Sequence, residues 1–206
     1  MNIRFDITAW HLENYNAVFL IANVVAVICT TLVIAAILLD FVHYHRPRQS
    51  KRKVNSWVET GSMFVYFFIY LLLMKPAFGR LDIQSELLLG IIQVSGMILL
   101  IAGCYVNIKG RLILKHNWAN QVTIYHNHAL ITTSVYRWVR HPLYASLIWM
   151  LAGGSLIYQS YLALLSVFVI FLPMMCYRAK QEEKLLIKEF PEYSQYKQRT
   201  GMLFPR

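Results

Sequence analysis

The chain has 206 residues, of which 57% are hydrophobic and only 15% are charged, and its mean hydropathy is +0.45. Soluble domains carry roughly a quarter charged residues, whereas here the apolar residues form long blocks, so the composition excludes an ordinary soluble domain and predicts a polytopic membrane protein. The formal net charge of +10 does not require a nucleic-acid partner, because basic residues beside anionic lipid headgroups account for it.

Five apolar blocks along the chain predict five transmembrane helices and an all-α fold. The blocks cover residues 17–39, 61–78, 87–106, 143–158 and 161–177. A spanning helix needs about 20 apolar residues, so the last two blocks are short for full spans. Only Gln159 and Ser160 separate these two blocks, which predicts a tight helical hairpin in which Gly153 and Gly154 permit close helix contact.

The distribution of basic residues predicts the orientation in the membrane. Of the 20 lysines and arginines, 17 follow the first, third or fifth block, and only Arg4, Lys75 and Arg80 fall on the other side. By the positive-inside rule the N-terminus lies outside and the C-terminus lies in the cytoplasm, as five spans require. Such a protein belongs in a bacterial inner membrane or a membrane of the endoplasmic-reticulum type.

The chemically unusual residues lie in the loop 107–142 and the tail 178–206, which are expected on the same side of the membrane. The loop ends in a polar and aromatic run that reaches Tyr144, and such side chains at a membrane boundary indicate a binding site. Pro142 suits the first turn of the following helix, whose free backbone N–H groups and positive dipole end face the cytoplasm.

The tail carries a candidate pair, Arg178 and Glu182, which are four residues apart and therefore share a helix face. The usual alternative for Glu182 and Glu183 is a solvated face paired with lysines. Their position one turn after the last apolar block, on the same side as a loop rich in Arg, His and Tyr, favours a functional site instead. An amphipathic pattern continues to Phe190 and predicts a helix that lies along the membrane surface or packs on the loop.

Several other kinds of site are disfavoured. His126, His128 and His141 form no metal triad, because no carboxylate or cysteine is spaced to complete one, so we expect no metal. The three cysteines lie in or at the ends of apolar runs and predict neither a disulfide framework nor a zinc site. The absence of a Gly-rich phosphate loop, a Ser-His-Asp order and an HExxH motif argues against a Rossmann cofactor site and against serine or zinc proteases.

Three motifs follow one another in the C-terminal half. They are His128-x-Leu130-x-Thr132-x-x-x-Tyr136, then Arg140-His141-Pro142-x-Tyr144, and after the hairpin Arg178-x-x-x-Glu182-Glu183-x-x-Leu186 with Phe190-x-x-Tyr193-x-x-Tyr196. In this order they resemble the isoprenylcysteine carboxyl methyltransferase family and the related phospholipid methyltransferases.

The resemblance implies an integral membrane enzyme that transfers a methyl group from S-adenosylmethionine to a lipophilic acceptor. The acceptor would be an isoprenylcysteine carboxylate or a lipid carboxylate, thiol or amine. The cofactor-binding residues carried over by position are Gln121, His128, Ala129, Leu130, Ile131, Tyr136, His141, Pro142, Leu143, Tyr144 and Glu182. Arg178 matches a position on the substrate side and is the expected catalytic residue. The chain then divides into an N-terminal membrane part (1–106) and a catalytic half (107–206).

These residue types suit the chemistry that the resemblance implies. Tyrosine faces attract a sulfonium cation, and a carboxylate such as Glu182 can pair with an ammonium group or with ribose hydroxyls. Methyl transfer to an acceptor that is already anionic needs little acid–base help, so alignment of the two reactants supplies most of the acceleration.

Three positions depart from the family pattern. Ser134 and Ser146 stand where the family usually has glycine, and Lys115 replaces the glycine of a Leu-Gly pair. Serine adds a Cβ atom and a hydroxyl where glycine lets the backbone approach closely. These changes bear on the identity of the acceptor.

Two other interpretations of the function remain open. One is a membrane reductase of the sterol type that binds NADPH, and the other is a small membrane scaffold or transporter that uses the loop and tail for docking.

Overall fold

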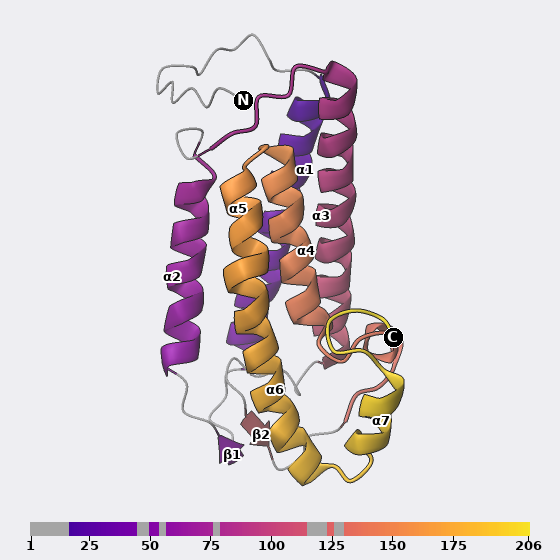
Figure 1. Cartoon of the computed structure of the whole chain (residues 1–206). Helices are drawn as coiled ribbons and strands as arrows, with labels where there is room; N and C mark the ends of the chain where they lie inside the picture. The colour runs from indigo at the N-terminus through magenta and orange to yellow at the C-terminus, as the bar shows by residue number, and fades with distance from the viewer. Residues whose placement is uncertain (1–16, 45–49, 54–56, 76–78, 115–122, 126–129) are drawn as a thin grey trace.

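Figure 1 shows the computed structural model of the chain, which describes residues 17–44, 50–53, 57–75, 79–114, 123–125 and 130–206. Its helices are α1 (Ala17–Tyr44), α2 (Trp57–Leu73), α3 (Glu86–Leu114), α4 (Pro142–Ile157), α5 (Tyr161–Ser166), α6 (Leu172–Glu189) and α7 (Tyr193–Arg199). The predicted helical architecture is confirmed. A small antiparallel ribbon of β1 (Ser50–Lys53) and β2 (Thr123–Tyr125) was not predicted.

Helices lie at all five predicted positions, and three helical stretches are long and apolar enough to cross a membrane. These stretches are Ala17–Val42, Glu86–Leu114 and Tyr161–Glu189, and two shorter apolar helices cover Gly61–Leu73 and Pro142–Ile157. Many large apolar side chains of α1 are exposed on the bundle, among them Leu20, Val24 and Val27. Apolar groups in such numbers on an outer surface are expected where lipid rather than water surrounds a helix.

The fifth apolar block differs from its prediction, because its helix does not end at Tyr177. α5 passes through a π-helical turn, η5 (Val167–Phe171), directly into α6, which continues to Glu189. Pro173 at the start of α6 has no N–H to donate to the preceding turn, and a π turn is a common way to accommodate such a break. The polar end of α6 is therefore a continuous extension of a candidate membrane-spanning helix.

Glycines bring α3 and α4 into close contact. A Cβ atom on Gly96 would lie 2.6 Å from the carbonyl oxygen of Gly153, and one on Gly103 would lie 2.7 Å from that of Ser146. The predicted role of Gly153 in close packing is confirmed, but its partner is α3 rather than the other arm of the hairpin. Gly154 lies against the Tyr70 hydroxyl of α2 instead.

Aromatic residues attach α2 to the hairpin. The rings of Tyr66 and Phe171 stack with centroids 4.7 Å apart, and the Tyr70 hydroxyl donates to the Leu151 carbonyl at 2.7 Å. In Figure 1 α2 stands beside α5 and α6, on the side of the bundle opposite to α3. α2 is therefore held against both α4 and the π-helical turn η5.

Candidate active site

The candidate site lies where α4 begins beside the polar end of α6, and where α7 and the C-terminus return to the bundle (Figure 1). Glu182 is the first centre of this site. The Tyr144 hydroxyl donates to Glu182 Oε2 at 3.1 Å, and His141 Nδ1 lies 3.5 Å from the same oxygen. Arg178 Nε donates to the Tyr144 hydroxyl oxygen at 3.1 Å. The predicted common face of Arg178 and Glu182 is thus confirmed, since both contact Tyr144.

The start of α4 forms an aromatic wall behind Glu182. The His141 and Tyr144 rings are stacked, with centroids 5.5 Å apart and planes 6° apart, and Pro142 occupies the first turn as predicted. The His141 side chain is only 5% exposed, whereas that of Glu182 is 37% exposed. The site therefore presents a carboxylate that solvent can reach beside a buried aromatic surface.

Glu183 is the second centre, and no role of its own was predicted for it from the sequence. Its carboxylate is 3% exposed and accepts hydrogen bonds from Arg140 Nε at 2.8 Å and from Lys197 Nζ at 2.8 Å. His141 Nε2 lies 3.3 Å from Glu183 Oε1. The third motif contains Glu183 beside Glu182, and their position favoured a functional site for both, but only Glu182 was assigned to the cofactor.

The C-terminal arm, residues 200–206, holds the segment that precedes α4. Val139 and Gly201 form a parallel bridge, and the Gly201 and Met202 carbonyls accept from the backbone N–H groups of Arg140 at 2.9 Å and His141 at 3.1 Å. The Arg140 guanidinium also donates to the Thr200 carbonyl. The backbone of Arg140 and His141 is therefore fixed by a part of the chain that lies about 60 residues further on.

Two carboxylates set the charge state of His141. Burial disfavours the imidazolium, but Glu182 and Glu183 lie against its two ring nitrogens and together raise the pKa of His141 above its usual value. A protonated His141 gives each carboxylate a cationic hydrogen-bond donor. The two centres of the site are thus joined through one ring.

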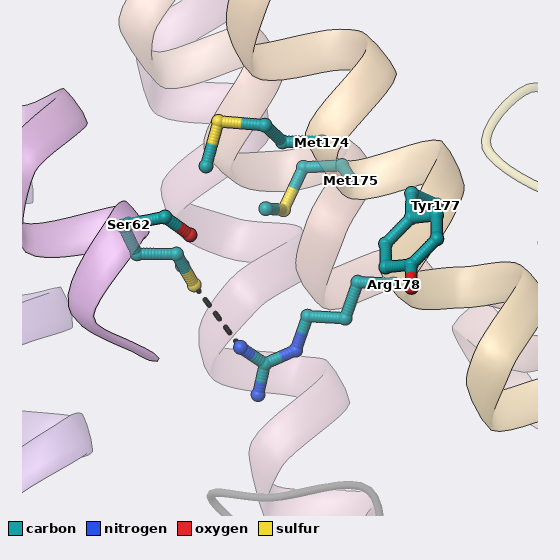
Figure 2. Close-up of a pocket in the computed structure, with 6 residues that line it drawn as sticks. Ser62, Met174, Met175, Tyr177 and Arg178 are labelled. Atoms are coloured by element: carbon teal, nitrogen blue, oxygen red, sulfur yellow. Dashed lines mark hydrogen bonds between the residues drawn. The ribbon is translucent and has the colours of Figure 1, made fainter. Parts of the chain in front are cut away.

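Arg178 borders a small apolar pocket between α2 and α6. The pocket has a volume of about 60 Å³ and is lined by Ser62, Met63, Met174, Met175, Tyr177 and Arg178. Figure 2 shows the Arg178 guanidinium extended towards α2, where its NH1 atom contacts Met63 Sδ at 3.2 Å. The same guanidinium lies 5.8 Å from the Tyr144 ring centroid. Arg178 therefore stands between the polar cluster around Glu182 and an apolar cavity.

The remaining predicted residues fall into two groups. Tyr136 is buried, and its hydroxyl contacts the Gly110 carbonyl of α3 at 3.5 Å, while Leu130, Ile131 and Leu143 are half-buried. Gln121, His128 and Ala129 lie outside the described residues.

The two serines that replace family glycines have distinct surroundings. Ser134, the first residue of the short 3-10 helix η4 (Ser134–Arg137), has a φ of 57°, which is in the left-handed region that favours glycine. Ser146 is fully buried, and its hydroxyl donates to the Leu143 carbonyl at 2.7 Å. The first serine retains the backbone conformation of a glycine, whereas the second adds a hydrogen-bonding group inside the bundle.

Comparison with known proteins shows what this part of the chain is similar to. Residues 96–188 match the model of the isoprenylcysteine carboxyl methyltransferase (ICMT) family. This segment is similar to the ICMT family. It contains Arg178, Glu182 and the start of α4, so the resemblance drawn from the motifs is confirmed.

Two ICMT proteins are similar over part of their length. Protein-S-isoprenylcysteine O-methyltransferase from Saccharomyces cerevisiae is 31% identical over 115 residues, which are 54% of this chain and 48% of that protein. The structure of the eukaryotic intramembrane Ras methyltransferase ICMT, solved without a monobody, matches with a TM-score of 0.53 at 22% identity and covers 74% of this chain and 54% of its own. The chain thus spans about half the length of both proteins, and the structural match is one of fold.

Proposed function

We propose that the chain is an integral membrane methyltransferase that transfers a methyl group from S-adenosylmethionine to a lipophilic acceptor. The observation that carries this proposal is the contact of Tyr144 and His141 with Glu182, beside Arg178, inside the segment that matches the ICMT family model. The site joins a solvent-accessible carboxylate to an apolar pocket. An enzyme that combines a polar cofactor with a lipophilic substrate needs both.

The described residues fit such a cofactor, which carries a carboxylate, an ammonium group, a ribose, an adenine and a sulfonium. The 37% exposed carboxylate of Glu182 suits the ammonium group or the ribose hydroxyls, and the ring faces of His141 and Tyr144 suit the adenine or the sulfonium. We assign cofactor binding to Leu130, Ile131, Tyr136, His141, Pro142, Leu143, Tyr144 and Glu182, with Gln121, His128 and Ala129 from the adjoining loop.

The residues of the chain accelerate methyl transfer by holding the two reactants in position rather than by transferring protons. When bound, S-adenosylmethionine supplies an electrophilic methyl group. Arg178 orients an anionic acceptor group at the border of the pocket, and Tyr144 fixes that guanidinium through its hydroxyl. A carboxylate acceptor is already ionised at neutral pH, so alignment of the two reactants is the main source of acceleration.

The acceptor that we favour is an isoprenylcysteine carboxylate. The yeast relative is by name an isoprenylcysteine O-methyltransferase, and the methionines and Arg178 of the small pocket here suit the anionic end of an apolar chain and the carbons next to it. A lipid carboxylate, thiol or amine can also accept a methyl group from S-adenosylmethionine. Isotopic methyl groups followed from labelled methionine into lipids and prenylated peptides distinguish these acceptors.

We further propose five membrane crossings with the N-terminus outside and the C-terminus cytoplasmic. α2 and α4 are the short spans. Such helices can cross the membrane when they are tilted little and the bilayer is locally thinner. This topology places the loop 107–142 and the tail 178–206 of the catalytic half (107–206) at the cytoplasmic surface, where S-adenosylmethionine is available, and leaves 1–106 as the N-terminal membrane part. It suits a bacterial inner membrane or one of the endoplasmic-reticulum type.

Ligand binding tests the proposal directly. We expect protein purified in detergent to bind S-adenosylhomocysteine in isothermal titration and to show no saturable binding of NADPH. NADPH binding without S-adenosylhomocysteine binding would identify a sterol-type reductase. Binding of neither ligand would favour a scaffold or transporter, in which Glu182→Gln and His141→Ala disturb assembly or transport alone.

A further inference from the structure

A buried chain of hydrogen bonds connects α1, through α3, to the first turn of α4. Arg111 NH1 on α3 donates to Asp40 Oδ2 on α1 at 2.6 Å, and Arg111 Nε donates to Asn107 Oδ1 at 2.8 Å. Asn107 Nδ2 donates to Ser146 Oγ at 2.8 Å, and Ser146 Oγ donates to the Leu143 carbonyl at 2.7 Å. We call the four side chains of Asp40, Arg111, Asn107 and Ser146 the polar chain.

Burial of the polar chain costs hydration free energy, so it is an unfavourable way to hold helices together. Asn107 and Ser146 are 0% exposed, and Asp40 and Arg111 are 7% and 9% exposed. Well-packed apolar residues of similar volume often stabilise a fold as well as a buried ion pair does, because the pair must first lose its hydration. What apolar packing does not supply is direction, since a hydrogen bond fixes the distance and angle between two groups. Ionisable residues within membrane helices accordingly mark function by default.

The polar chain ends at residues beside the candidate site. Leu143, whose carbonyl is its last acceptor, precedes Tyr144, which donates to Glu182 and accepts from Arg178. α3 leaves little room for this turn to move, because a Cβ atom on Gly110 would lie 3.0 Å from Leu143 Cδ2. A change in the hydrogen bonds at Ser146 therefore shifts the backbone that carries Tyr144.

We propose that Asp40, Arg111, Asn107 and Ser146 are positioning residues, which set the first turn of α4 so that Leu143 and Tyr144 meet the cofactor. This inference rests on the proposed methyltransferase function. Asp40 lies on α1, outside the family segment 96–188, so the N-terminal membrane part of the chain takes part in forming the site. Ser146, where the family usually has glycine, gives the polar chain its connection to α4.

The test compares the affinity for S-adenosylhomocysteine with thermal stability, both measured on the full chain in one detergent. Ser146→Ala removes the hydroxyl, Asp40→Asn removes the charge, and Asp40→Glu restores the carboxylate. Tyr70→Phe is the matched control, because it removes a buried hydrogen bond between α2 and α4 at a distance from the site.

We expect Ser146→Ala and Asp40→Asn to raise the dissociation constant about five- to tenfold, which is the effect of one misplaced hydrogen bond. Asp40→Glu should recover most of the affinity. Tyr70→Phe should lower the melting temperature but change the dissociation constant less than about twofold. If Asp40→Asn does not fold, because the buried Arg111 loses the carboxylate at 2.6 Å, Ser146→Ala decides the question.

Two results overturn the inference, and they are distinguishable. Wild-type affinity in both Ser146→Ala and Asp40→Asn shows that the polar chain has no positioning role, and the proposed function then stands. Failure of the wild-type protein to bind S-adenosylhomocysteine removes the proposed function, and the positioning role with it.

Discussion

The adjacent carboxylates Glu182 and Glu183 are expected to respond to the same substitution in opposite ways. Glu183 is 3% exposed and touches Arg140, which is 8% exposed, so Glu183→Gln leaves a buried cation without its partner. Such a loss costs about 3–5 kcal/mol of folding free energy. Lys197, which is 46% exposed, adds less than about 1 kcal/mol because solvent screens it. Glu182 is 37% exposed, and we expect its substitution to cost about 1 kcal/mol or less of stability.

The affinity for S-adenosylhomocysteine should respond in the reverse order, with the larger loss at Glu182 and the smaller loss at Glu183. Glu182→Gln removes a carboxylate that we assign to the cofactor and should weaken S-adenosylhomocysteine binding by about 1–3 kcal/mol. Thermal unfolding in detergent and isothermal titration measure the two quantities on the same preparation, and Glu192→Gln on the exposed start of α7 is the control. Equal destabilisation by Glu182→Gln and Glu183→Gln, or an unchanged affinity in Glu182→Gln, would refute the assignment of one carboxylate to binding and the other to structure.

Three further predictions concern the residues around these carboxylates. Because the pKa of His141 is raised above its usual value of about 6.5, the stability that its protonated form contributes is complete below that pH and is lost as the pH rises through the raised pKa. The melting temperature should therefore fall as the pH rises above about 6.5 and through the raised pKa of His141, and His141→Asn should flatten this profile. Ser134→Gly relieves a φ of 57° and should stabilise the protein by about 0.5–1 kcal/mol in thermal unfolding, whereas a loss of stability would contradict the strain at this position. Gly201→Ala places a Cβ atom on the Phe204 carbonyl oxygen, so it should displace the C-terminal arm and cost about 2–4 kcal/mol, and an unchanged melting temperature would show that the arm is dispensable.

Local patterns predicted the elements that depend on local physics. Apolar blocks of about 20 residues marked the helices because a bilayer demands that length, and Pro142 marked the start of α4 because proline tolerates a first turn. The four-residue spacing of Arg178 and Glu182 predicted a shared face because an α-helix repeats every 3.6 residues. The end of the fifth helix was predicted wrongly, since a change from apolar to polar residues marks a membrane boundary rather than a helix end.

Tertiary contacts decided what these patterns did not predict. Nothing in the sequence separates Glu182 from Glu183 until α7 and the C-terminal arm cover one of them. Arg111 was counted only as a topology signal, because its partner Asp40 lies 71 residues away. A helix face, by contrast, is fixed by neighbours three and four residues apart, so its prediction needs no knowledge of the fold.

The positive charge of Arg178 at the pocket border is expected to affect the release of the product as well as the binding of the acceptor. Under the proposed function, Arg178 attracts an acceptor carboxylate, and a charge-assisted hydrogen bond of this kind is roughly twice as strong as a neutral one. Methylation of that carboxylate gives a neutral ester, so the same guanidinium holds the product less tightly than the substrate. Tyr144 fixes Arg178 through its hydroxyl and contacts Glu182 through the same oxygen, so one side chain connects the acceptor side with the cofactor side. Loss of the Tyr144 hydroxyl should therefore weaken both affinities, which a residue confined to one of the two sides would not do.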